Sequence, residues 1–180
     1  MCSYHMSSNG STADWDKLES YNLYQLLQDL SIPIVQHVRT ALAVIGDGAK
    51  RMHSVVVSDS RLGKIIETCA KLDSVVPKIA EAWFDFWDSP VEAGTALEQR
   101  ASVLRQISEW VLDMDRVTLD VADHFRAQFA EDLLVMTMEM SRIRRMFAYY
   151  CDLYDELRIS LSVHEACSPL DDSRGGADRL

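Results

Sequence analysis

Apolar residues recur at alternating intervals of three and four through most of the chain. Three runs show this spacing most clearly: Val35, Val38, Leu42, Ile45, Ala49, Met52 and Val56; Leu62, Ile65, Cys69, Leu72, Val76, Ile79 and Trp83; and Met136, Met140, Ile143, Phe147, Tyr150, Tyr154, Leu157 and Leu161. Side chains at this spacing share one face of an α-helix, so each run forms an apolar stripe that needs a partner. The pattern therefore predicts long helices packed nearly parallel, as in a bundle or coiled coil.

The first third of the chain is predicted to form two helices. The first covers residues 14–30 and ends at Ser31-Ile32-Pro33, because proline lacks an amide hydrogen and suits the first turn of a new helix, with Ser31 as its cap. The second covers residues 32–57. Gly46 and Gly48 lie within it, but the apolar spacing continues across them, so we expect one helix; a tight turn at residues 46–48 is the alternative.

A third helix is expected to follow the break at residues 58–60 and to reach about residue 87. Pro77 should kink it, because the proline ring clashes with the preceding turn. The next boundary combines Ser89, Pro90 and Glu92, which have the spacing of a capping box with proline in the first turn. A fourth helix begins there, with an apolar stripe made of Leu97, Ala101, Leu104, Ile107, Val111 and Met114.

Residues 91–162 contain no proline, and their single glycine is Gly94. One continuous helix over this segment would be about 108 Å long, which is too long for one compact domain. We therefore expect a break near residues 115–120, where Thr118 and neighbouring aspartates can cap a new start, and a fifth helix over residues 119–161. The alternative is one long helix that needs a second chain as its partner.

These elements predict an all-α fold: an antiparallel bundle of four to five long helices, with up-and-down connections and a long C-terminal helix. The bundle should occupy residues 13–162 as one domain. Residues 1–12 and the acidic and polar tail 163–180 have little to bury and are expected to be disordered. We interpret residues 1–5 as a cloning remnant, because His5 precedes a second methionine, Met6.

Composition narrows the possible partners. The chain has 180 residues, 48% of them hydrophobic, and a net charge of −10, so nucleic acid and anionic membranes are disfavoured as partners. No apolar stretch approaches the length of a bilayer span, and no signal-peptide core is recognisable. Cys2, Cys69, Cys151 and Cys167 are far apart, and we expect reduced thiols in an intracellular, cytoplasmic protein.

The sequence offers little support for catalysis. Glu-x-x-His pairs of the kind that bind two iron ions in bundles do not occur, and His37, His53 and His124 lie on separate segments. There is also no nucleophile elbow, phosphate-binding loop or dinucleotide fingerprint. We therefore predict no catalytic residue, no cofactor and no metal site, and a protein that is not an enzyme.

Six residues are candidates for contact with a partner because they are large or charged and do not all fit one buried face: Trp83, Phe86, Trp87, Met138, Arg142 and Arg145. Aromatic rings at 83–87 point in at least two directions on a helix, so one of them can anchor a partner; packing between two neighbouring helices is the alternative. Met138 is out of phase with the Met136 stripe. The arginines can bind acidic partners, or can pair with Glu139, Asp152 and Asp155 of their own helix.

The leading functional hypothesis is a non-enzymatic interaction domain of scaffold or regulatory type, which docks helix on helix and associates with a second copy of itself as a homodimer. One alternative is a bundle that holds an apolar small molecule or lipid between its helices. A second is a membrane-acting bundle similar to the helical domains of cell-death effectors. The negative charge argues against the second alternative.

Overall fold

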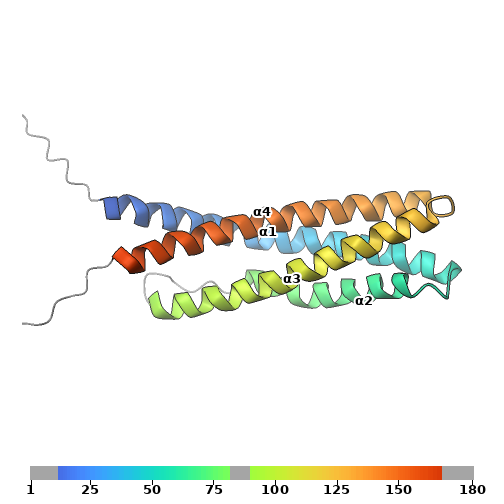
Figure 1. Ribbon diagram of the computed structural model, residues 1–180, viewed down its shortest axis with the longest axis horizontal. Coiled ribbons are helices and arrows are strands. Elements are labelled where there is room, and N and C mark those ends of the chain that lie inside the picture. Colours follow the sequence, from blue (N-terminus) through green and yellow to red (C-terminus); the bar gives the residue numbers. More distant parts are fainter. Residues whose placement is uncertain (1–11, 82–89, 168–180) are drawn as a thin grey trace, which may run out of the picture.

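The computed structural model describes residues 12–81 and 90–167, with side chains over residues 20–81 and 97–162. Four α-helices occupy these ranges: α1 (Thr12–Val55), α2 (Ser60–Val75), α3 (Pro90–Phe125) and α4 (Ala130–Cys167), with a 3₁₀ helix η1 (Val76–Ala80) after α2. They run alternately up and down, and α1 and α3 each pack against both α2 and α4 (Figure 1). The predicted all-α bundle with a long C-terminal helix is confirmed.

The predicted apolar stripes form the core. Within the described residues, every stripe position from Val35 to Met52, from Leu62 to Ile79 and from Met136 to Leu157 is at most 9% exposed. The stripe of the predicted fourth helix, from Leu97 to Met114, is buried in the same way. Trp83 lies outside the described residues. Burial of one stripe from each helix supplies the main stabilisation of such a bundle.

The predicted break at Pro33 is wrong, because α1 continues through it. Ser31 is not a cap: its hydroxyl donates to the Leu27 carbonyl at 2.7 Å and lies 2.9 Å from the Tyr150 hydroxyl of α4. Ile34 and Val35 continue the buried face beyond the proline. Packing of both halves of α1 against α4 therefore outweighs the hydrogen bond that proline removes.

The two glycines inside α1 do not interrupt it, so the prediction of one helix is confirmed there and the alternative turn is wrong. Gly48 lies where α1 and α4 approach closely. A Cβ atom on Gly48 would lie 2.9 Å from the Met136 sulfur, whereas a Cβ atom on Gly46 would meet only Cys69, at 3.8 Å. The absence of a side chain at Gly48 thus allows the close packing of these two helices.

The turn between α1 and α2 lies at the predicted break. Asp59 is the N-cap of α2, and its carboxylate accepts a hydrogen bond from the Arg61 amide at 2.9 Å. The Arg61 guanidinium also pairs with Asp59 and with Asp120 of α3, and it lies over the Phe125 ring at 5.6 Å from the centroid. These contacts hold the N-terminal end of α2 against α3.

The predicted third helix is shorter than expected. Instead of kinking at Pro77 and reaching residue 87, α2 ends at Val75 and η1 begins, with Pro77 in its first turn. Proline cannot complete an α-helical hydrogen bond, but it fits the start of a new helical turn. Arg100 of α3 donates to the carbonyls of Ile79 and Glu81, which satisfies the end of η1. Residues 82–89 lie outside the described range.

The hidden turn of the second half exists, but its predicted position is wrong. Helix α3 starts at Pro90 as expected, runs through residues 115–120 and ends at Phe125, and α4 starts at Ala130. Asp115 is buried against α4, where it accepts a hydrogen bond from Arg144 at 2.8 Å. It therefore joins two helices instead of starting one. The alternative of a single helix over residues 91–162 is wrong as well.

Ion pairs join each pair of adjacent helices. Arg39 pairs with Asp73 between α1 and α2, and Arg51 pairs with Asp132 between α1 and α4. The pairs Lys64–Asp113, Arg144–Asp115 and Arg158–Glu98 join α3 to its two neighbours. Each exposed pair adds little stability, but together they favour one register of the bundle. Within the described helices, no segment is long and apolar enough to cross a membrane.

Candidate interaction surface

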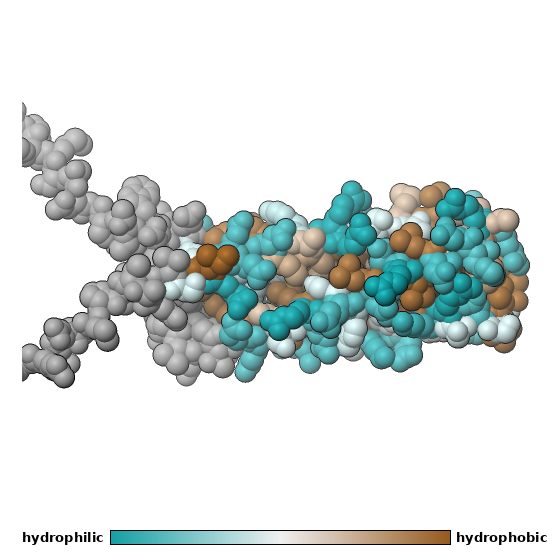
Figure 2. All heavy atoms as spheres, in the orientation of Figure 1, coloured by the Kyte–Doolittle hydropathy of each residue, from teal (hydrophilic) through white to brown (hydrophobic). Residues whose placement is uncertain are grey.

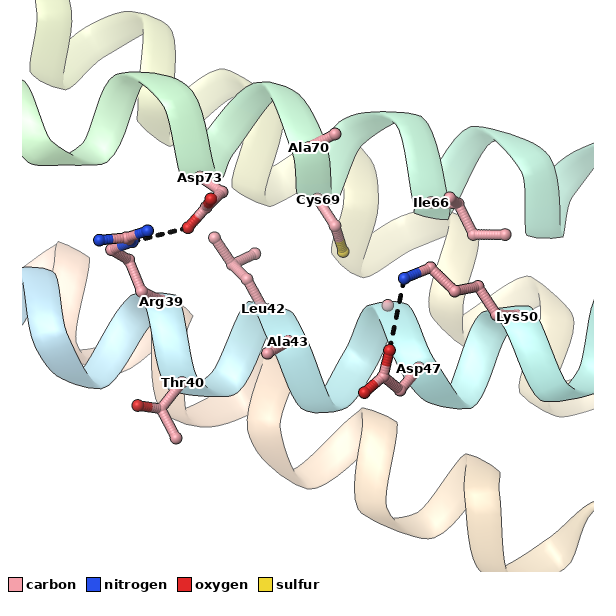
Figure 3. A pocket seen from close by; sticks show the side chains of 11 residues that line it. Arg39, Thr40, Leu42, Ala43, Asp47, Lys50, Ile66, Cys69, Ala70 and Asp73 are labelled. Carbon is pink, nitrogen blue, oxygen red and sulfur yellow. Dashed lines mark hydrogen bonds and ion pairs between the residues drawn. The ribbon is translucent and has the colours of Figure 1, made fainter.

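A groove of about 520 Å³ lies between α1 and α2. Leu42 of α1 and Cys69 of α2 point into the space between the two helices (Figure 3). Small residues such as Ala43 and Gly46 also line the groove. An ion pair lies toward each end: Arg39 with Asp73 at 2.7 Å and Lys50 with Asp47 at 3.4 Å. These charges pair with each other across or beside the groove, so they are not aimed at a ligand between them.

Cys69 and Cys151, whose side chains the structure describes, are poorly suited to nucleophilic chemistry. Burial raises the pKa of Cys69 to about 12, and burial also raises the pKa of Cys151, which lies 3.6 Å from the Ser108 hydroxyl. Both thiols are therefore neutral near pH 7, whereas reactive cysteines need a lowered pKa. Among the described residues, no cluster of three His, Cys, Asp or Glu side chains is arranged to hold a metal ion.

The outer face of α4 is more distinctive. Opposite its buried stripe, eight exposed residues repeat the same spacing of three and four. We call them the outer stripe: Val135, Met138, Arg142, Arg145, Tyr149, Asp152, Glu156 and Ile159. Met138 is 61% exposed, Tyr149 55% and Ile159 65%. On the face shown in Figure 2, hydrophobic residues form small patches between hydrophilic ones. The outer stripe likewise places apolar side chains next to charged ones.

The charges of the outer stripe are separated along the helix. Arg142 and Arg145 come first, and Asp152 and Glu156 follow about two turns later. Arg142 pairs with Glu139 at 3.5 Å, and Arg145 donates to the Ser141 carbonyl at 3.3 Å. Within the described part of the chain, Asp152 and Glu156 take part in no ion pair. The predicted pairing with carboxylates of the same helix thus holds for Arg142 and Glu139, whereas Asp155 pairs with Arg158.

Arg144 differs from its neighbour Arg145. Its guanidinium pairs with Asp115 of α3 at 2.8 Å, and the Asp115 side chain is only 12% exposed. Arg144 therefore stabilises the contact between α3 and α4, while Arg145 lies on the outer stripe. One residue of offset on the helix separates an arginine that pairs with the neighbouring helix from one that bonds within its own helix.

Three of the six predicted contact residues lie together on this face: Met138, Arg142 and Arg145. Trp83, Phe86 and Trp87 lie outside the described residues, and their proposed role stays a prediction. Sequence reasoning missed the other members of the outer stripe. Their signal is present in the sequence, because they repeat at intervals of three and four in a phase opposite to that of the Met136 stripe.

We compared the chain with known protein families, curated proteins and solved structures. No protein-family model, no curated protein and no solved structure matches the chain.

Proposed function

We propose that the chain is a non-enzymatic helical interaction domain that associates with a second copy of itself through the outer face of α4. The observation that carries this proposal is the outer stripe, which places exposed Met138, Tyr149 and Ile159 in line with Arg142 and Arg145. Methionine, tyrosine and arginine are enriched in protein interfaces, where they combine apolar contact area with polar groups.

Several features support an interaction role over a catalytic one. The charged groups of the groove between α1 and α2 are paired with each other, and burial keeps the thiols of Cys69 and Cys151 neutral. The bundle itself provides a rigid support, because α4 packs on α1 and α3 along its inner face. A rigid helix loses little conformational entropy on docking, which favours association.

The test is the solution mass measured by light scattering after size exclusion, over a wide range of concentrations. We expect the mass to rise from 20.4 kDa toward twice that value as the concentration increases. A monomer mass at every concentration up to about 1 mM, where even weak specific association is detected, would contradict the proposal.

A pair of substitutions locates the surface. Met138→Asp places a charge within the outer stripe of α4, and Leu112→Asp places the same charge on the exposed face of α3, where Leu112 is 54% exposed. We expect Met138→Asp to weaken association about tenfold or more, and Leu112→Asp to leave it unchanged within about twofold. Equal effects of both substitutions would show that association is not specific to α4.

A further inference from the structure

The outer stripe is nearly self-complementary about its midpoint, which lies at the level of Phe147. Resting on the proposed function, we propose that a second copy docks on the outer face of α4 in the antiparallel direction, with the two-fold axis crossing the interface at the level of Phe147, whose own side chain lies on the opposite, buried face. Positions equally distant from Phe147 in the two directions then face each other across the interface. A two-fold interface requires this property, because one surface patch must complement itself.

The centre of the stripe supplies charge complementarity. Arg142 lies five residues before Phe147 and Asp152 five residues after it, so Arg142 of each copy faces Asp152 of the other. Arg145 and Tyr149 lie two residues before and after Phe147. Each Arg145 guanidinium therefore stacks on Tyr149 of the second copy, as arginine does on aromatic faces. Symmetry provides each of these contacts twice.

The ends of the stripe supply apolar contact. Val135 lies twelve residues before Phe147 and Ile159 twelve residues after it, so these two branched aliphatic side chains face each other. Met138 faces Glu156 of the second copy, which lies nine residues after Phe147. The methionine packs against the aliphatic part of the glutamate, whose carboxylate stays at the edge of the interface in water.

The spacing suits this geometry. Residues 135–159 form about 36 Å of helix at 1.5 Å per residue, and a stripe with intervals of three and four is the pattern that lets two helices pack side by side. Exposed Ser141 and Ala148 flank the middle of the stripe. Their small side chains let the two helices approach near the two-fold axis.

Other arrangements of the same two stripes are less favourable. A parallel pairing in register places Arg142 against Arg142 and Asp152 against Asp152, which repels twice. An antiparallel pairing shifted by seven residues in one direction places Arg142 against Arg145 of the second copy. The opposite shift moves Met138 beyond the end of the stripe. The charge of −10 per chain also repels two copies in general, so specific pairing of the separated charges must select the orientation.

Charge reversal and mixing tests the arrangement. Arg142→Glu alone brings two carboxylates face to face, because the new side chain meets Asp152 of the second copy, and Asp152→Arg alone brings two guanidinium groups face to face. We expect each variant to weaken its own homodimer about tenfold or more. In an equimolar mixture, the heterodimer joins a chain that is acidic at both positions, 142 and 152, to a chain that is basic at both positions, so each of its contacts joins opposite charges. We therefore expect a heterodimer about as stable as the wild-type dimer. The readouts are the light-scattering mass and native mass spectrometry, which distinguishes the heterodimer from each homodimer.

Matched controls change the net charge equally without touching the stripe. Arg105→Glu and Glu109→Arg lie on exposed positions of α3, and we expect neither of them to change the dimer affinity by more than about twofold. A wild-type chain that stays monomeric at all concentrations would overturn the proposed function and this arrangement together. A dimer that Arg142→Glu does not weaken, or that mixing does not restore, would overturn the antiparallel register while self-association stands.

Discussion

The inner and outer faces of α4 use the same spacing for different purposes. The inner face, from Met136 to Leu157, buries almost all of its side-chain surface against α1 and α3. The outer face keeps apolar side chains at its two ends and arranges charges in two blocks between them. Apolar burial is strong but does not select an orientation, whereas separated charges are weak in water but selective. We infer that the inner face stabilises the fold and that the charges of the outer face determine the orientation in which a second copy docks.

The outer face of α3 provides a useful contrast. On this face, exposed charges of opposite sign lie four residues apart, as in Arg105 and Glu109 and in Arg116 and Asp120. Charges of opposite sign three to four residues apart compensate each other within one helix. The charges on α4 are grouped instead, so a second helix that runs in the opposite direction can neutralise them. Substitutions on the inner face of α4 should therefore lower the stability of the fold, whereas substitutions on the outer face should weaken association.

The largest difference should appear between two neighbouring aromatic residues of α4. Phe147 is 2% exposed on the inner face and Tyr149 is 55% exposed on the outer face. We expect Phe147→Ala to lower the free energy of unfolding by about 3–5 kcal/mol, because it leaves a cavity in the core. Tyr149→Ala should change it by less than about 0.5 kcal/mol and should weaken the dimer instead. Urea unfolding followed by circular dichroism, at concentrations where the chain is monomeric, measures both values. Similar losses of unfolding free energy for the two variants would contradict the different roles of the inner and outer faces.

Two adjacent arginines give the next largest contrast. Arg144→Ala leaves the nearly buried Asp115 carboxylate without its partner, and we expect the free energy of unfolding to fall by about 1–2 kcal/mol. Arg145→Ala removes a side chain that, among the described residues, bonds the Ser141 carbonyl of its own helix, so stability should stay within about 0.5 kcal/mol. The dimer affinity should respond in the opposite order, and light scattering on both variants checks it. A stability loss for Arg145→Ala equal to that of Arg144→Ala would contradict the assignment of these faces.

The two glycines of α1 test how tightly the inner face of α4 is packed. Gly46→Ala has room for its Cβ atom, 3.8 Å from Cys69, and should stabilise the helix by about 1 kcal/mol. Gly48→Ala meets Met136 at 2.9 Å, so we expect overpacking to offset that gain and to leave a net loss of about 1 kcal/mol. Thermal and urea unfolding of both variants measure the difference. Equal gains for the two variants would mean that α1 and α4 are less closely packed than described.

The smallest of these expected effects is that of salt, which should change the dimer affinity more than the stability of the monomer. Raising the ionic strength from about 0.05 to 0.5 M screens exposed charges, because the Debye length falls well below the spacing of the charge blocks. Salt also screens the general repulsion between two chains of net charge −10, so the charge pairs are measured by a difference: the affinity advantage of the wild-type dimer over the Arg142→Glu dimer should shrink several-fold. The unfolding free energy of the monomer should change by less than about 1 kcal/mol. Sedimentation equilibrium at the two salt concentrations checks the first value. An affinity advantage that salt leaves unchanged would indicate apolar rather than charge-selected docking.

Much of the fold can be predicted from the sequence, because the spacing of apolar residues identifies one buried stripe for each helix. The starts of α2 and α3 are also predictable, since Asp59 and Pro90 suit a helix start. Pro33 and the turn after Phe125 are not. Tertiary packing carries α1 through the proline, and the turn at residues 126–129 contains no glycine or proline to mark it. Instead, backbone hydrogen bonds from Gln128 and Phe129 to the Phe125 carbonyl close that turn.

The candidate surface was only partly predictable for a related reason. Met138, Arg142 and Arg145 are conspicuous by type or position, and the sequence alone singles them out. Asp152 and Glu156 resemble ordinary solvent-facing acids until the buried face of α4 is known. The structure identifies that face, and the complementarity of residues on either side of Phe147 then becomes visible. The twofold pattern depends on which residues share a face, which spacing alone does not decide.

Cysteine cross-linking tests the central claim most directly, because it reports which residues meet. Val135→Cys and Ile159→Cys are made separately in a chain whose Cys2 and Cys167 are replaced by serine, and they are oxidised alone and as an equimolar mixture. The antiparallel arrangement predicts a cross-linked dimer in the mixture, composed of one chain of each kind, and little cross-linking of either variant alone. The parent chain without the new cysteines serves as the control. Efficient cross-linking of Val135→Cys with itself, or none in the mixture under conditions where the dimer forms, would contradict the account.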